Sequence, residues 1–98
     1  MIQELPAGLR PYKRTPIFVE TTIPAGLRRR HSTKEEVWGL IRVLDGRLLY
    51  RILDPREEII LDPAHPGVVE PTRLHEVEPI GPVRFFVEFH VDAATAKK

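Results

Sequence analysis

The chain has 98 residues, of which 42% are hydrophobic and 30% charged, which predicts one soluble globular domain rather than a disordered segment. Its formal net charge of +1 gives no general attraction to nucleic acid or to an anionic membrane surface. It contains no cysteine, so disulfide bonds, cysteine-ligated zinc and a thiol nucleophile are excluded.

The N-terminus lacks the basic start and apolar run of a secretory signal. The longest apolar runs are also much shorter than a membrane span. We therefore expect a cytoplasmic protein with neither a membrane nor a nucleic acid as its partner.

Ten prolines and six glycines are spread along the chain and separate short runs of alternating apolar residues. This pattern is typical of an all-β barrel or sandwich. Asp45-Gly46 predicts a two-residue hairpin turn, and residues 80–82 predict another turn. Residues 1–91 are expected to form the domain and residues 92–98 a frayed tail. In chain order, the predicted strands are 15–23, 38–44, 47–53, 57–61, 67–70, 75–78 and 83–91.

Two histidines are the main candidates for chemistry. His31 and His75 each follow a turn and each precede a strand, so closure of a rolled sheet is expected to bring their rings face to face. Imidazole nitrogen and carboxylate oxygen are ligands for divalent metals. The alternative is that each histidine is solvated in a loop or bonded to the backbone.

A third metal ligand is sought on the last strand, where Glu88 is the first candidate and His90 the next. Placed inward, Glu88 would have to be paired or ligating, because burial of a free carboxylate is costly. The alternative is that Phe85, Val87 and Phe89 face inward and that Glu88 is solvated.

Positive charge is concentrated beside His31, where Arg30 and Lys34 stand close to it in a basic stretch that begins at Arg28. Such a stretch could draw an anion toward a barrel mouth, although it is more often a solvated strand end. Trp38 begins a strand and is either a core or interface residue or a surface on which a ligand stacks.

Six short segments carry recognisable motifs: 31–34, 37–39, 43–46, 69–71, 75–78 and 86–89. Taken together, they resemble the TehB-like domain family, which includes the YeaR-like proteins. The resemblance implies a single-domain cupin, a small jelly-roll-like β-barrel, that forms a homodimer and is associated with tellurite resistance. Metal-binding cupins carry two histidines and a carboxylate in a first motif and one histidine in a second. His31 and His75 match this pattern, whereas Thr33 stands at the second histidine and Trp38 or Gly39 at the carboxylate.

The function predicted from these features is that of a small cupin-type binding protein. It would hold a divalent metal (zinc, iron, manganese or nickel), a small molecule or an oxyanion in the barrel mouth, with His31, His75 and Glu88 as metal ligands. Further ligand contacts would come from Arg30, Thr33, Lys34, Trp38 and His90. The alternatives are a metal-dependent cupin enzyme that acts on a small substrate and a metal-free sensing or interaction module. A methyltransferase is not expected, because the chain leaves no room for a nucleotide-binding α/β domain.

Overall fold

The computed structural model describes residues 5–29, 31–53 and 56–92. The predicted all-β fold is confirmed, since the helical part of the described residues is limited to one short 3-10 turn, η1. No helix within these ranges is long and apolar enough to cross a membrane. The elements are β1 (Leu9–Arg14), β2 (Phe18–Val19), η1 (Ala25–Arg28), β3 (Trp38–Leu53), β4 (Arg56–Leu61), β5 (Gly67–Val69) and β6 (His75–Asp92).

The strands form one six-stranded sheet in the order β1-β6-β3-β4, with β2 added to β6 and β5 added to β3. All pairs are antiparallel. The two longest strands, β3 and β6, pair from Trp38 opposite His90 to Ile52 opposite His75. On its other edge, β3 pairs with β5 through its first few residues and with β4 through its second half. The finer assignment of a cupin jelly roll stays a prediction.

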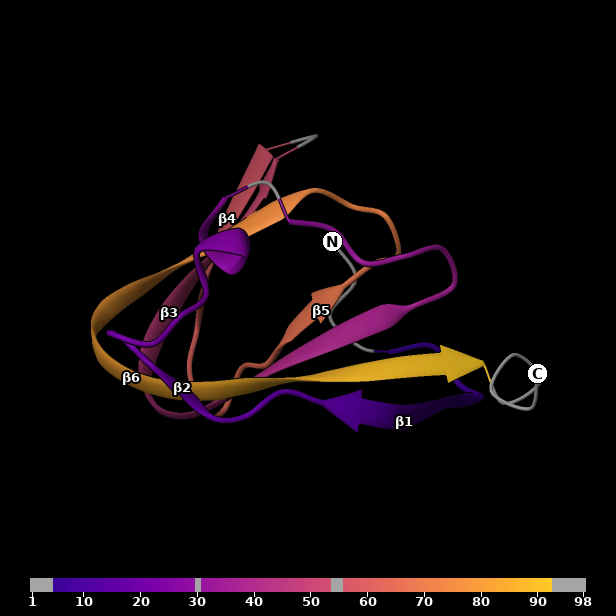
Figure 1. Ribbon diagram of the computed structural model, residues 1–98, viewed down its shortest axis with the longest axis horizontal. Coiled ribbons are helices and arrows are strands. Elements are labelled where there is room, and N and C mark those ends of the chain that lie inside the picture. Colours follow the sequence, from indigo (N-terminus) through magenta and orange to yellow (C-terminus); the bar gives the residue numbers. More distant parts are fainter. Residues whose placement is uncertain (1–4, 30, 54–55, 93–98) are drawn as a thin grey trace.

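The sheet bends sharply where β3 and β6 each contain a glycine. Gly46 and Gly81 have φ angles of +82° and +70°, and the pairing register shifts on either side of Gly46. Figure 1 shows β6 curving back at this point, so that its two halves lie in different layers of the fold. The long strands therefore fold over and enclose a core between their halves.

Two predicted turns are wrong for the same reason. Asp45-Gly46 was expected to end one strand and start its hairpin partner, yet β3 continues through it and both of its halves pair with β6. The proline-glycine stretch 80–82 likewise lies within β6. A glycine with positive φ can form part of a tight turn, or it can form a bulge that bends a continuous strand. Here each glycine bends a continuous strand.

The two ends of the chain also differ from the predicted boundaries. Only Phe18–Val19 is strand within the predicted run 15–23, and the unpredicted β1 pairs with β6 through an irregularity near Pro11. Proline in β1 is compatible with an edge strand, where a missing N–H group costs little. At the C-terminus, Asp92 belongs to β6 rather than to a tail, and residues 93–98 lie outside the described residues.

The core follows the alternation that the sequence shows in the second half of β3. Leu48, Tyr50 and Ile52 are buried, as are Phe85 and Val87 of β6. Tyr50 is fully buried, and its hydroxyl donates a hydrogen bond to the Val68 carbonyl at 3.0 Å. This hydrogen bond satisfies the hydroxyl, which is the one polar atom of the buried Tyr50 side chain.

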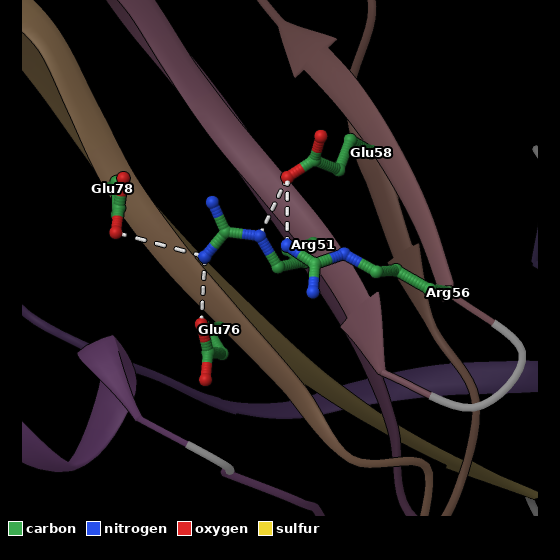
Figure 2. Close-up of polar contacts among 5 residues, drawn as sticks. All are labelled: Arg51, Arg56, Glu58, Glu76 and Glu78. Carbon is green, nitrogen blue, oxygen red and sulfur yellow. Dashed lines mark hydrogen bonds and ion pairs between the residues drawn. The ribbon is translucent and has the colours of Figure 1, made fainter.

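The opposite face of the same strands carries a cluster of ion pairs around Arg51 (Figure 2). Arg51 Nε lies 2.7 Å from a Glu58 oxygen, and Nη1 lies 2.7 Å from Glu76 and 3.6 Å from Glu78. Arg56 reaches the same Glu58 oxygen at 3.6 Å. One guanidinium thus joins β4, β3 and β6, and its hydrogen bond lowers the pKa of Glu58. Glu76 and Glu78 point away from the core, as period-two alternation requires.

Candidate functional site

The backbone of β6 brings His31 and His75 together. His75 begins β6, with Ile52 of β3 on one side and His31 on the other. The His31 and His75 backbones exchange two hydrogen bonds of 2.8 Å, in which each N–H donates to the other residue's carbonyl. This isolated bridge adds the segment containing His31 to the free edge of the bent sheet.

The two imidazole rings are in direct contact and nearly perpendicular. Nδ1 of His31 lies 3.4 Å from Nε2 of His75, and the ring planes meet at 85°. On its other side, the His75 ring is 3.0 Å from the Arg73 carbonyl through Nδ1 and lies edge-on to the Tyr50 ring. His75 is 3% exposed, whereas His31 is partly exposed.

Burial keeps both rings neutral at neutral pH. Desolvation lowers the pKa of His31 below its ordinary value, and it lowers that of His75 as well. The hydrogen bond to the Arg73 carbonyl offsets part of this lowering of the His75 pKa, and the neighbouring His31 adds to the lowering. A neutral imidazole has one donor nitrogen and one acceptor nitrogen.

These contacts determine which nitrogen of each ring carries the proton. The Arg73 carbonyl can only accept, so His75 Nδ1 must be the donor and His75 Nε2 the acceptor. His31 Nδ1 must then donate to His75 Nε2, which leaves His31 Nε2 with a lone pair. Within the described part of the chain, that nitrogen has no hydrogen-bond partner.

The pair stands between a small internal cavity and a larger open hollow. The cavity has a volume of about 20 Å³, which is room for about one water molecule, and apolar side chains line most of it. The hollow measures about 220 Å³ and is bordered by His31 and Thr33 together with both Lys13 and Lys34. His31 borders both spaces, so it separates the interior from the surface.

Of the remaining predicted site residues, Thr33 and Lys34 lie beside His31 and border the hollow. The Thr33 hydroxyl donates to the Val37 carbonyl at 2.7 Å. Arg30 lies outside the described residues.

Trp38, Glu88 and His90 lie on the other face of the sheet. Trp38 is opposite His90, and Glu88 is opposite Leu40, whereas the neighbouring residue Gly39 faces the cavity. Glu88 pairs with Arg42 at 3.1 Å and lies 3.5 Å from Nε2 of His90. His90 is buried, and its ring nitrogens have no hydrogen-bond partner among the described residues. The structure thus does not bring these three residues to the histidine pair.

Three contributors to the site escaped the sequence reasoning. Lys13 and Tyr12 border the hollow from β1, a strand that was not predicted because its alternation is interrupted by Pro11. The Arg73 carbonyl orients His75, and a backbone group leaves no signal in the residue types.

The fold and the site define a small all-β domain with a buried histidine pair at the edge of a bent antiparallel sheet. The TehB-like domain family matches residues 13–87, and the chain belongs to this family.

The relatives found by sequence are proteins of Haemophilus influenzae named "Probable S-adenosyl-L-methionine-dependent methyltransferase TehB". The protein of strain Rd is 31% identical over 72 residues, which are 68% of this chain and 25% of that protein. The protein of strain 10810 is 28% identical over the same shares. The chain therefore spans about a quarter of the length of these curated relatives.

Solved structures show the same fold. The crystal structure of TehB from Haemophilus influenzae superposes with a TM-score of 0.80 at 28% identity, covering 88% of this chain and 32% of that one. A crystal structure of a protein from Escherichia coli K12 gives a TM-score of 0.83 at 22% identity, covering 93% of this chain and 98% of that one. The second likeness shows the fold alone.

The predicted metal-binding cupin function is wrong, and so is the predicted divalent metal cofactor. The homologues are named as probable methyltransferases that depend on S-adenosyl-L-methionine. The described residues include no group of three or more histidines and carboxylates that could hold an ion. Protein metal sites generally supply three or four ligands, and here Glu88 lies on the opposite face from the two histidines. The small-molecule or oxyanion ligand and the homodimer stay predictions.

Proposed function

We propose that this chain is a non-catalytic companion domain of an S-adenosyl-L-methionine-dependent methyltransferase. The observation that carries the proposal is the match to TehB, in which a domain of this fold occupies about a quarter of the protein. A small domain that accompanies an enzyme can orient a substrate, cover an active site or stabilise the enzyme. The proposal includes a cytoplasmic location beside that enzyme and leaves a homodimer as a further expectation.

Three spaces among the described residues do not fit S-adenosyl-L-methionine itself. The cavity and the hollow at the histidine pair measure about 20 and 220 Å³, below the several hundred Å³ that cofactor sites usually occupy. A third hollow of about 580 Å³ is open and has Arg28, Arg29 and Glu78 among its walls, without the apolar lining that such sites have. The methyl donor therefore belongs to the partner enzyme in this proposal.

The test is a domain exchange in Haemophilus influenzae TehB. The segment of TehB that matches this chain is replaced by the chain in one version and by a glycine-serine linker in another. We expect the chimera to retain methyl transfer from S-adenosyl-L-methionine and the linker version to lose most of it. Binding of S-adenosyl-L-methionine, measured by calorimetry on both versions, checks that the rest of TehB is folded. Equal turnover by two versions that both bind the methyl donor would show that this domain is no companion of the enzyme.

A further inference from the structure

The open hollow beside His31 combines an apolar wall with polar groups of specific kinds. Phe89, Val37 and Tyr12 contribute the apolar part. The charged part comes from Lys13 and Lys34, which approach from β1 and from the loop before β3. At about 220 Å³, the hollow is suited to a small single-ring or branched molecule rather than to a polymer or a nucleotide.

His31 Nε2 has no hydrogen-bond partner among the described residues, and Tyr12, Ser32 and the two lysines bring further polar groups to the border of the same hollow. The bonds from His31 to His75 and from His75 to the Arg73 carbonyl make this nitrogen an acceptor. The two nitrogens of an imidazole ring point in widely different directions, so Nε2 of His31 points away from His75. His31 borders the hollow and His75 does not. The neighbouring Thr33 hydroxyl donates its hydrogen to the Val37 carbonyl, and its oxygen can still accept a hydrogen bond.

We propose that this hollow binds a small, largely apolar molecule that donates a hydroxyl hydrogen bond to Nε2 of His31. An oxyanion would place its lone pairs against the lone pair of Nε2. A cation would be repelled by Lys13 and Lys34. A neutral hydroxyl satisfies both groups, because its hydrogen bonds to the imidazole while its oxygen accepts from an ammonium group. This ligand site is independent of the companion role proposed above.

The experiment compares two probes of nearly equal shape on the intact chain. Phenol carries the O–H donor, and anisole has a methyl group in place of that hydrogen. We expect phenol to bind about fivefold more tightly in an NMR titration, the effect of one net hydrogen bond. We expect His31→Phe to abolish the preference, because phenylalanine keeps a ring but has no acceptor. The control variant His65→Phe changes a histidine whose side chain is 73% exposed in another loop, and it should keep the preference.

Equal affinity for phenol and anisole in the unmodified protein would overturn the proposal, and so would a phenol preference that persists in folded His31→Phe. Tighter binding of inorganic sulfate than of phenol would also overturn it. If His31→Phe does not fold, the comparison of the probes on the unmodified protein decides alone.

Discussion

The histidine pair shows how burial and hydrogen bonding together fix the state of two titratable groups. A single imidazole in water exchanges freely between its two neutral forms. Here the Arg73 carbonyl selects the form of His75, and His75 in turn selects the form of His31. The result is an ordered row of donors that begins at the protein surface and ends on the backbone.

The stability of the fold should fall as these histidines become protonated. Their pKa values are lowered in the folded chain from the ordinary value of 6.5, so the unfolded chain binds more protons at mildly acidic pH. The free energy of unfolding should therefore be highest above the unfolded pKa and should decrease between about pH 7.5 and about pH 5. Urea unfolding across this range measures the slope.

One variant assigns the pH dependence to the pair. His31→Phe removes one of the two groups and should flatten the slope. A free energy of unfolding that does not vary over this range in the unmodified protein would mean that the pair is not desolvated.

At the scale of elements, the bends in β3 and β6 determine where everything else lies. The sequence signals Asp45-Gly46 and Gly81-Pro82 were interpreted as turns, because local residue types specify a change of direction but not its partner. The alternation itself is informative: Leu48 and Tyr50 occupy alternate positions of the predicted strand 47–53, and both are buried. The two halves of each long strand stay continuous because both halves pair with the other long strand. That pairing depends on residues far apart in the sequence.

Alanine substitutions at three glycines separate the contributions to the bend. A Cβ atom at Gly46 would lie 2.1 Å from the Pro82 carbonyl oxygen, at a φ of +82°, so both a clash and backbone strain oppose Gly46→Ala. We expect a loss of about 3 kcal/mol or more in the free energy of unfolding. Gly81→Ala meets strain without a clash and should cost about 1 kcal/mol. Gly26→Ala meets neither and should change stability by less than about 0.5 kcal/mol. Chemical denaturation checks this order, and equal losses at Gly46 and Gly26 would contradict the bend.

For the molecule as a whole, the sequence was sufficient to predict the family and the all-β fold, because short motifs and strand alternation are local. It was not sufficient for the site. Glu88 and His90 were assigned to the histidine site, but Phe85, Val87 and the cavity share the opposite face of β6. A shift of one residue in register decides which face a side chain takes, and pairing with β1 and β3 sets that register.

The contact between His31 and His75 is also a property of the whole molecule. The two residues are 44 positions apart and meet because the bent sheet returns β6 to the segment before β3. Their shared site needs the β6 bend, the Arg73 carbonyl and the buried Tyr50 ring at the same time. The family relationship adds that a domain of this fold occurs within TehB, so the arrangement can be sought there directly.

Multiple-bond ¹H–¹⁵N NMR of the histidine rings tests this arrangement most directly. For both His31 and His75 at neutral pH, we expect a proton on Nδ1 and a bare Nε2, whereas free histidine favours the opposite form. We also expect a through-hydrogen-bond correlation or a close contact between His31 Nδ1–H and His75 Nε2. A proton on Nε2 of either ring would contradict the row of hydrogen bonds and the acceptor that it presents to the hollow.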